Sequence, residues 1–143
     1  MTDTGVLTDQ QSAFIEGQRV AHLATADAQG QPHVVPVCFV LREGKFYVSI
    51  DEKPKRSVRL KRVRNIEENA RVALVFDQYT EEWEGLGYVL VFGRASVLEG
   101  GAEYEAALAG LRERYAQYRS QALEGRPVVR IEAERSASWG RLG

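Results

Sequence analysis

The strongest chemical signal in the sequence is a dense run of cationic side chains near its middle. Residues 53–64 read KPKRSVRLKRVR, and seven of these twelve positions carry a positive charge. The cationic residues are Lys53, Lys55, Arg56, Arg59, Lys61, Arg62 and Arg64. Because the whole chain has a formal net charge of -1, this run concentrates a local positive field that favours an anionic ligand.

The position of the run favours a phosphate. It follows a predicted strand that ends at Ile50, and Pro54 is typical of the first turn of a helix. A helix N-terminus attracts anions through its free backbone N–H groups and the positive end of its dipole. The side chains that add charge or hydroxyl donors there are Lys53, Lys55, Arg56, Ser49 and Ser57. We therefore expect this element to hold a phosphate or a longer anionic chain.

Two other interpretations of the run stay open. Arg59, Arg62 and Arg64 are typical of a solvated helical face, where Glu67 or Glu68 would pair with them. A nucleic-acid site would need aromatic side chains beside the charges, and residues 53–64 contain none.

The elements that position the run are mostly short strands joined by turns. The hydrophobic pattern predicts six strands, at residues 20–26, 31–41, 45–50, 71–76, 88–98 and 127–133. The first three are close enough in sequence for an antiparallel meander, and Gly93 marks a bulge or a close backbone approach in the fifth. Thr8 and Gln11 have the spacing of a capping box that opens a short helix.

A longer amphipathic helix is predicted at residues 101–122, within which Tyr104, Leu108, Leu111 and Tyr115 form one apolar stripe. Strands thus dominate, so we predict a mainly β (α+β) fold, an antiparallel barrel with peripheral helices. A length of 143 residues fits a single domain, 1–143.

Composition excludes several classes of protein. The near-neutral charge argues against a dedicated nucleic-acid or membrane-surface protein, and no apolar run approaches the roughly 20 residues that span a bilayer. Cys38 is the single cysteine, so the sequence allows no internal disulfide. Residues 1–11 are polar and unlike a secretory signal. We expect a cytoplasmic protein with no membrane or nucleic-acid partner.

Other chemistry-bearing residues make weaker sites. On one regular strand, His33 and Cys38 would lie on opposite faces, so Cys38 is interpreted as a core residue rather than a nucleophile. His22 and His33 are the only histidines, and two histidines without a third ligand do not predict a metal site.

The segment RVAHLATADAQGQPHVVPVCFVLREGKFYVSIDEKPKRSVRLKRVRNIEENARVALVFDQY resembles the pyridoxamine 5'-phosphate oxidase-like FMN-binding split-barrel superfamily. The DEKPKR element and the Tyr79-x-x-x-Trp83 spacing are similar to its flavin/deazaflavin oxidoreductase branch, whose probable cofactor is coenzyme F420. The resemblance covers about residues 12–98. The segment GLGYVLVFG departs from that branch, which carries tryptophans between Leu86 and Val89.

The resemblance implies a six-stranded antiparallel split β-barrel that forms a homodimer, with two cofactor sites at the interface. In such proteins the cofactor ring lies along the second strand, and the phosphate or phosphate-glutamate tail meets the basic element. Aromatic residues of the partner subunit approach the ring or tail. The implied cofactor residues are His33, Val34, Val35, Pro36, Val37, Ser49, Lys53, Lys55, Arg56, Trp83 and Trp139.

The implied function is hydride transfer between coenzyme F420 and a small organic substrate, with no metal and with Tyr79 as a candidate proton donor. The clustered cations favour a long anionic tail, although a lone FMN phosphate could also use them. The alternatives are an FMN-dependent oxidoreductase of the same fold, or a non-catalytic protein that binds flavin, deazaflavin or haem.

Overall fold

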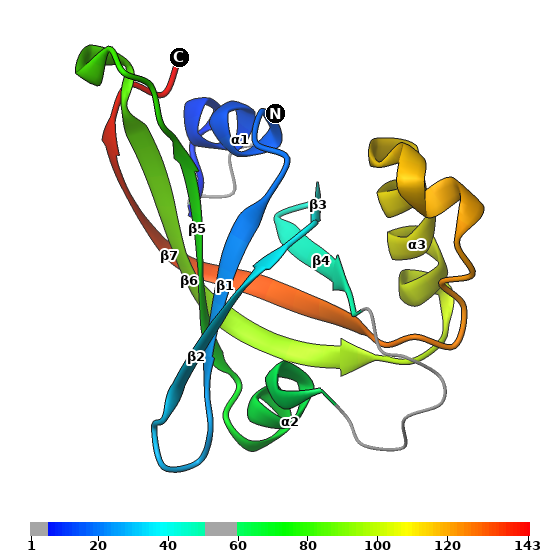
Figure 1. Ribbon diagram of the computed structural model, residues 1–143. Coiled ribbons are helices and arrows are strands. Elements are labelled where there is room, and N and C mark those ends of the chain that lie inside the picture. The colour runs from blue at the N-terminus through cyan, green and yellow to red at the C-terminus, as the bar shows by residue number, and fades with distance from the viewer. Residues whose placement is uncertain (1–5, 51–59) are drawn as a thin grey trace.

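A curled antiparallel sheet forms the frame of the computed structural model, which describes residues 6–50 and 60–143 (Figure 1). Its strands are β1 (Ala21–Ala26), β2 (Pro32–Val37), β3 (Val40–Arg42), β4 (Lys45–Ser49), β5 (Arg71–Gln78), β6 (Gly87–Leu98) and β7 (Val128–Gly140). They follow the order β2-β1-β5-β6-β7-β4-β3 across the sheet. The predicted mainly β fold with peripheral helices is confirmed, with seven strands in place of six.

The extra strand arises because predicted strand 31–41 breaks at Cys38 and Phe39. β2 pairs with β1, whereas β3 pairs with β4, and the two pieces lie at opposite edges of the sheet. The predicted meander of three strands is therefore wrong. Since His33 and Cys38 do not share one regular strand, the argument that placed them on opposite faces no longer applies. Cys38 is half-buried between the two strands.

The helices lie around the sheet (Figure 1). They are α1 (Asp9–Glu16), α2 (Lys61–Glu68) and α3 (Ala102–Arg114), with the 3-10 turns η1 (Trp83–Gly85) and η2 (Ala116–Ser120). The capping box of Thr8 and Gln11 is confirmed at the start of α1. The long helix predicted at 101–122 ends earlier, at Arg114, but its apolar stripe is buried as predicted. Within the described residues, none of the helices has the length and hydrophobicity to cross a bilayer.

The interior of the barrel is filled by aromatic and branched side chains. Phe39, Phe46 and Phe76 are fully buried, and the ring of Phe76 lies 5.0 Å from that of Phe39 and 5.3 Å from that of Phe46. Two polar residues, Thr25 and Asn65, are buried with this core. Apolar burial of this kind supplies the main driving force for folding.

β6 and β7 form the longest strand pair, and β7 continues well past the predicted end at residue 133. The pairing register shifts between Phe92 and Gly93, which confirms the predicted irregularity at Gly93. A Cβ at this position would clash with the backbone carbonyl of Glu132, so only glycine fits.

Candidate functional site

β2, the strand on which the cofactor was predicted to lie, presents two different surfaces. His33, Val35 and Val37 lie on its inner side, since His33 pairs with the buried Thr25 and Val37 with the buried Ala21. Val34 and Pro36 point outward, and 63% of Val34 is exposed. The predicted residues 33–37 therefore divide between the inside of the barrel and the outer face of the sheet.

β2 is also an edge strand. In the order of the sheet it has β1 on one side and no strand on the other among the described residues. Alternate backbone N–H and C=O groups of an edge strand point away from its single neighbour and stay available for hydrogen bonding. A planar heteroaromatic ring with carbonyl and N–H groups at its rim could bind such an edge, much as an added strand does.

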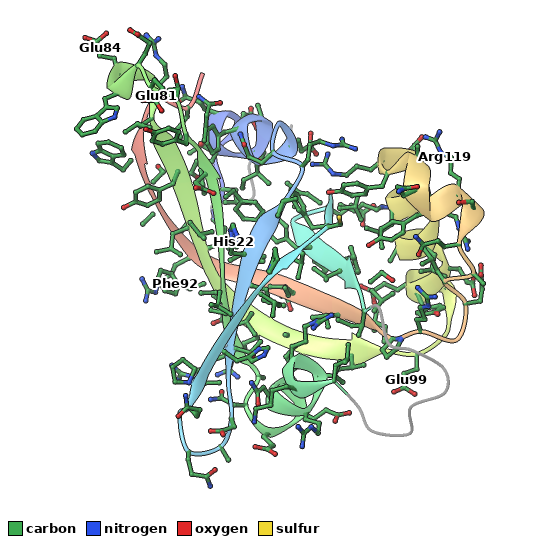
Figure 2. The ribbon with its side chains drawn as sticks, viewed as in Figure 1. His22, Glu81, Glu84, Phe92, Glu99 and Arg119 are labelled. Atoms are coloured by element: carbon green, nitrogen blue, oxygen red, sulfur yellow. The ribbon has the colours of Figure 1, made fainter. Side chains whose placement is uncertain are left out.

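An apolar outer face extends from β2 across five strands. Cross-strand pairing places Val34, Ala24, Ala73 and Phe92 in one row. Pro36, His22, Val75, Leu90 and Ala137 form the next row. Figure 2 shows Phe92 on the outer side of the sheet, and the guanidinium of Arg135 covers its ring at 3.9 Å. We call these two rows the outer sheet face.

Exposed aromatic side chains gather beyond the far end of the outer sheet face. Tyr88 and Trp139 are cross-strand partners, and their rings stack with centroids 6.1 Å apart. Trp83 on η1 is 70% exposed, and Trp139 is 55% exposed. β7 and β2 are four strand spacings apart, roughly 19 Å at ~4.8 Å each. Trp139 therefore does not meet β2 of its own chain.

A small cluster of buried polar side chains lies inside the barrel, between β1, β2 and α2. Asn65 on α2 is fully buried, and its Nδ2 donates a hydrogen bond of 3.0 Å to the hydroxyl of Thr25. Thr25 is the cross-strand partner of His33. Asn65 Oδ1 and His33 Nδ1 are both buried and have no hydrogen-bond partner among the described residues. Atoms of this kind are costly to bury unpaired, so they lower the stability of this part of the core.

α2 is fixed to the turn between β1 and β2 by three further contacts. Glu68 accepts a hydrogen bond from the backbone N–H of Ala28, Lys61 pairs with Asp27 at 3.7 Å, and Asn69 donates to the carbonyl of Asp27. Hydrogen bonds from the backbone of Gln31 and Gln29, with the nearby Lys61 charge, lower the pKa of Asp27. The helix and the hairpin therefore form one unit around these buried polar side chains.

The structure describes only the last part of the basic run 53–64. Lys53, Lys55 and Arg56 lie outside the described residues. α2 begins at Lys61 after an extended Leu60, so no single helix runs from the predicted start at Pro54 through residue 66; Pro54 itself lies outside the described residues. Ser49 is the last residue of β4, half-buried and paired with Val128. The structure does not bring Ser49 together with the exposed Trp83 and Trp139, which belong to the other end of the sheet.

Thr25 and Asn65 are the candidate site residues that sequence reasoning missed. A signal existed for Asn65, because it lies between Val63 and Ile66, the buried positions of an amphipathic helix. A polar residue on such a face needs a partner, and its sequence position gave no indication of which one. Within residues 6–50 and 60–143, no three His, Cys, Asp or Glu side chains are grouped so that they could hold a metal ion.

Comparison with known proteins agrees with this architecture. Residues 7–140 match the Pyridoxamine 5'-phosphate oxidase family. The chain belongs to this family. The predicted superfamily and its split-barrel fold are thereby confirmed. A relative of this pyridoxamine 5'-phosphate oxidase family member is the 5a,11a-dehydrotetracycline/5a,11a-dehydrooxytetracycline reductase of Streptomyces rimosus, 28% identical over 95% of this chain and 84% of that protein.

Solved structures share the fold of this pyridoxamine 5'-phosphate oxidase family member at lower identity. The haem storage protein HutZ from Vibrio cholerae superposes with a TM-score of 0.71 at 21% identity, covering 94% of each chain. An FAD-binding protein from Mesorhizobium loti gives 0.69 at 23% identity, covering 92% of this chain and 94% of that one. These likenesses establish the fold.

Proposed function

We propose that this chain is an oxidoreductase that binds coenzyme F420 along β2 and exchanges hydride with a small organic substrate. The observation that carries the proposal is the free edge of β2, whose open backbone groups can hydrogen-bond the rim of a deazaflavin ring. The reductase activity of the Streptomyces rimosus relative supports the reaction class.

The residues of the chain bind and orient, while the cofactor supplies the hydride. The backbone of residues 33–37 holds the ring edge, and Val35 and Val37 give it an apolar wall on the inner side. Lys53, Lys55 and Arg56 bind the phosphate and the anionic tail beyond it. Ser49 ends the strand that leads into this basic element. FMN is the alternative cofactor, because its single phosphate can use the same cations.

The outer sheet face supports a homodimer with the cofactor at its interface. It is broad and mostly apolar, as expected of a surface that a second copy covers. Because Trp139 lies four strands away from β2 within one chain, we expect the partner subunit's Trp139 and Trp83 to close the site over the ring. Tyr79, which is 66% exposed beside η1, remains the candidate proton donor.

Non-catalytic haem binding is the second candidate, because the structurally similar HutZ is a haem storage protein. The two histidines are the candidate axial ligands: His22 is exposed on β1, and His33 is half-buried on β2. A haem carrier would bind haemin tightly and would not oxidise or reduce a bound substrate.

Parallel titrations of the purified protein with coenzyme F420, FMN and haemin, followed by tryptophan quenching, test the proposal. Selective binding of F420, with hydride exchange to an added acceptor, is expected. Selective FMN binding would assign the alternative cofactor, and tight haemin binding without turnover would support the carrier. Binding of none of the three would overturn the proposed function.

A charge-removal variant tests the basic element. Lys55→Ala with Arg56→Ala should weaken cofactor binding by at least about 3 kcal/mol, because two charged phosphate contacts are lost. Arg19→Ala with Arg119→Ala is the matched control, since it removes two positive charges from exposed positions away from the outer sheet face. Equal affinity of the test variant and the control would place the phosphate site elsewhere.

A further inference from the structure

We propose that the exposed aromatic cluster at the end of β5, β6 and β7 binds a flat organic cation, and that such cations are the substrate class of the proposed oxidoreductase. The cluster consists of Trp83, Tyr88 and Trp139 with the carboxylate of Asp77 beside them, and we call it the aromatic platform. The assignment of the cation as substrate rests on the proposed function, whereas its binding is measurable without a cofactor.

The first argument is the arrangement of one cross-strand row. Asp77 on β5 pairs with Tyr88 on β6, and Tyr88 pairs with Trp139 on β7, so the three side chains point to the same face of the sheet. Directly paired residues have Cβ atoms about 5 Å apart, which places the Asp77 carboxylate beside the Tyr88 ring. The rings of Tyr88 and Trp139 stack with centroids 6.1 Å apart. An aromatic surface therefore has a carboxylate at its edge.

The second argument is that these rings are open to solvent on an ordered part of the chain. Trp83 is 70% exposed, Trp139 is 55% exposed and Tyr88 is 39% exposed. The backbone N–H of Leu86 donates a hydrogen bond of 3.2 Å to the carbonyl of Trp83, and that of Arg141 donates one of 2.8 Å to the carbonyl of Leu86. These bonds tie η1 to the end of β7, so a ligand can stack on the platform without disturbing the core.

The third argument is the charge around the platform. Residues 77–88 contain no Lys or Arg and carry four carboxylates, those of Asp77, Glu81, Glu82 and Glu84. All four are exposed, and none forms an ion pair within the described part of the chain. Figure 2 shows Glu81 and Glu84 on the turn that joins β5 to β6. These carboxylates outnumber Arg141, the cation that follows Trp139 in the sequence.

The chemistry of the platform selects a cation that carries a flat ring. The face of an indole or phenol ring is the negative part of its quadrupole, so it attracts a positive charge. The unpaired carboxylates attract the same sign of charge and repel anions. A neutral flat molecule gains only the stacking, and an inorganic cation gains no stacking.

The proposed dimer places this platform at the cofactor site. There the partner subunit's Trp139 and Trp83 close the site over the cofactor ring. A ligand that stacks on the platform would then lie between it and that ring, which is where a hydride donor or acceptor has to lie.

Three quinoline-based probes of similar shape and different charge test the inference with the full-length protein. At neutral pH, 1-methylquinolinium is a cation, quinoline is uncharged and quinoline-4-carboxylate is an anion. The chain has two tryptophans, and both belong to the platform, so the two indole N–H signals in the NMR spectrum of isotope-labelled protein report binding directly. We expect the cation to bind roughly ten-fold more tightly than quinoline, and the anion to bind most weakly.

Charge-neutralising variants identify the groups that recognise the cation. Asp77→Asn keeps the size of the side chain and should weaken binding of 1-methylquinolinium roughly five-fold, while the affinity for quinoline stays unchanged. Glu81→Gln with Glu84→Gln should act in the same direction, and added salt should reduce its effect. Glu105→Gln with Glu113→Gln, at exposed positions of α3, is the matched control and should change neither affinity.

Several results would overturn the inference. These are equal affinities of the wild-type protein for the cation and for quinoline, or an affinity for the cation that Asp77→Asn leaves unchanged. Indole signals that respond to no probe would also overturn it. A shift of those signals on dilution of the protein would then identify a second copy of the chain as the occupant of the platform.

Failure of this inference and failure of the proposed function give different results. A protein that binds coenzyme F420 or FMN but does not prefer the cationic probe keeps the proposed function and loses the inference. Charge-selective binding by a protein that binds neither cofactor would leave the platform as a cation site and would overturn both the hydride transfer and the assignment of the cation as its substrate.

Discussion

The side-chain hydroxyl of Tyr115 accepts a hydrogen bond of 3.2 Å from the backbone N–H of Phe39, at the point where the chain passes from β2 to β3. The same hydroxyl accepts a hydrogen bond from Nε of Arg114 and donates one to the carbonyl of Arg19. Tyr115 thus joins the end of α3, the segment after α1 and the break between the two strands. The buried N–H of Phe39, which has no partner in the sheet, is satisfied in this way.

Replacing Tyr115 by phenylalanine should destabilise the fold at this junction. The substitution keeps the ring but leaves the N–H of Phe39 buried without a partner, so the free energy of unfolding should fall by about 1–3 kcal/mol. Urea denaturation measures the change. Tyr79→Phe is the control, because that residue is exposed and its hydroxyl donates to the nearby Glu81. Equal midpoints for the two variants would contradict a structural role for the Tyr115 hydroxyl.

The Tyr115 contacts show why the sequence predicts the fold class better than its connections. The apolar stripe of Tyr104, Leu108, Leu111 and Tyr115 follows from helical spacing alone, and all four residues are buried. The break at Cys38 and Phe39 leaves no such signal, because residues 31–41 form a near-continuous apolar run. At this break the N–H of Phe39 donates a hydrogen bond to Tyr115, far along the chain, and the local sequence pattern does not predict that contact.

β7 is a second element whose full extent the local sequence pattern does not predict. Residues 127–133 alternate as a half-buried strand should, and this part was predicted. The continuation through Ser138 and Trp139 is exposed and polar in pattern, so its strand character comes from pairing with β6. Sequence reasoning likewise identified β2 and Trp139, but only the strand order and register show that the two lie at opposite ends of one face.

A charge on the outer sheet face should separate the proposed dimer. We expect the wild-type protein to be a dimer at micromolar concentration, and Val34→Asp to be a folded monomer, because an interface would bury the new carboxylate without a partner. Light scattering gives the mass in each case. Ala116→Asp on η2 is the control, since it adds the same charge at an exposed position away from that face. A monomeric wild-type mass would contradict the interface model.

Loss of the dimer should also reduce cofactor affinity, because the partner subunit's Trp139 would be absent from the site. Titration of Val34→Asp with coenzyme F420 and FMN checks this consequence. A monomer that binds its cofactor as tightly as the wild-type dimer would contradict the proposal that the partner subunit's tryptophans contribute to the cofactor site.

Tyr47 and Glu103 couple the stability of the fold to pH. The Tyr47 hydroxyl donates a 2.6 Å hydrogen bond to Glu103, which also accepts one from Arg130. Burial, together with this bond, raises the pKa of Tyr47 from 10.0 to about 12. The hydrogen bonds from Tyr47 and Arg130 lower the pKa of Glu103 below its usual value.

The pKa shifts of Tyr47 and Glu103 affect the stability of the fold at opposite ends of the pH range. Between pH values of about 10 and 12 the unfolded chain releases the Tyr47 proton while the folded chain keeps it, so stability falls as pH rises. Below about 4.5 the unfolded chain protonates Glu103 first, so stability falls as pH falls. The stability advantage of wild type over Tyr47→Phe should therefore be largest between these windows. Urea unfolding across pH measures it, and a pH-independent difference would contradict the coupling.

Gly93 fixes the bulge at which β6 and β7 change register, and its replacement should be costly. A Cβ there would meet the carbonyl oxygen of Glu132, a backbone atom that cannot rotate away, so Gly93→Ala must displace one strand from the other. We expect the free energy of unfolding to fall by about 1–3 kcal/mol. Gly100→Ala is the matched control, because a Cβ at Gly100 meets no atom within 4 Å. Denaturation midpoints compare the two variants, and similar values would show that the strand pair absorbs the methyl group.

Because β6 and β7 also carry Tyr88 and Trp139, the displacement of one strand by Gly93→Ala should weaken cofactor binding as well, whereas Gly100→Ala should leave cofactor affinity unchanged.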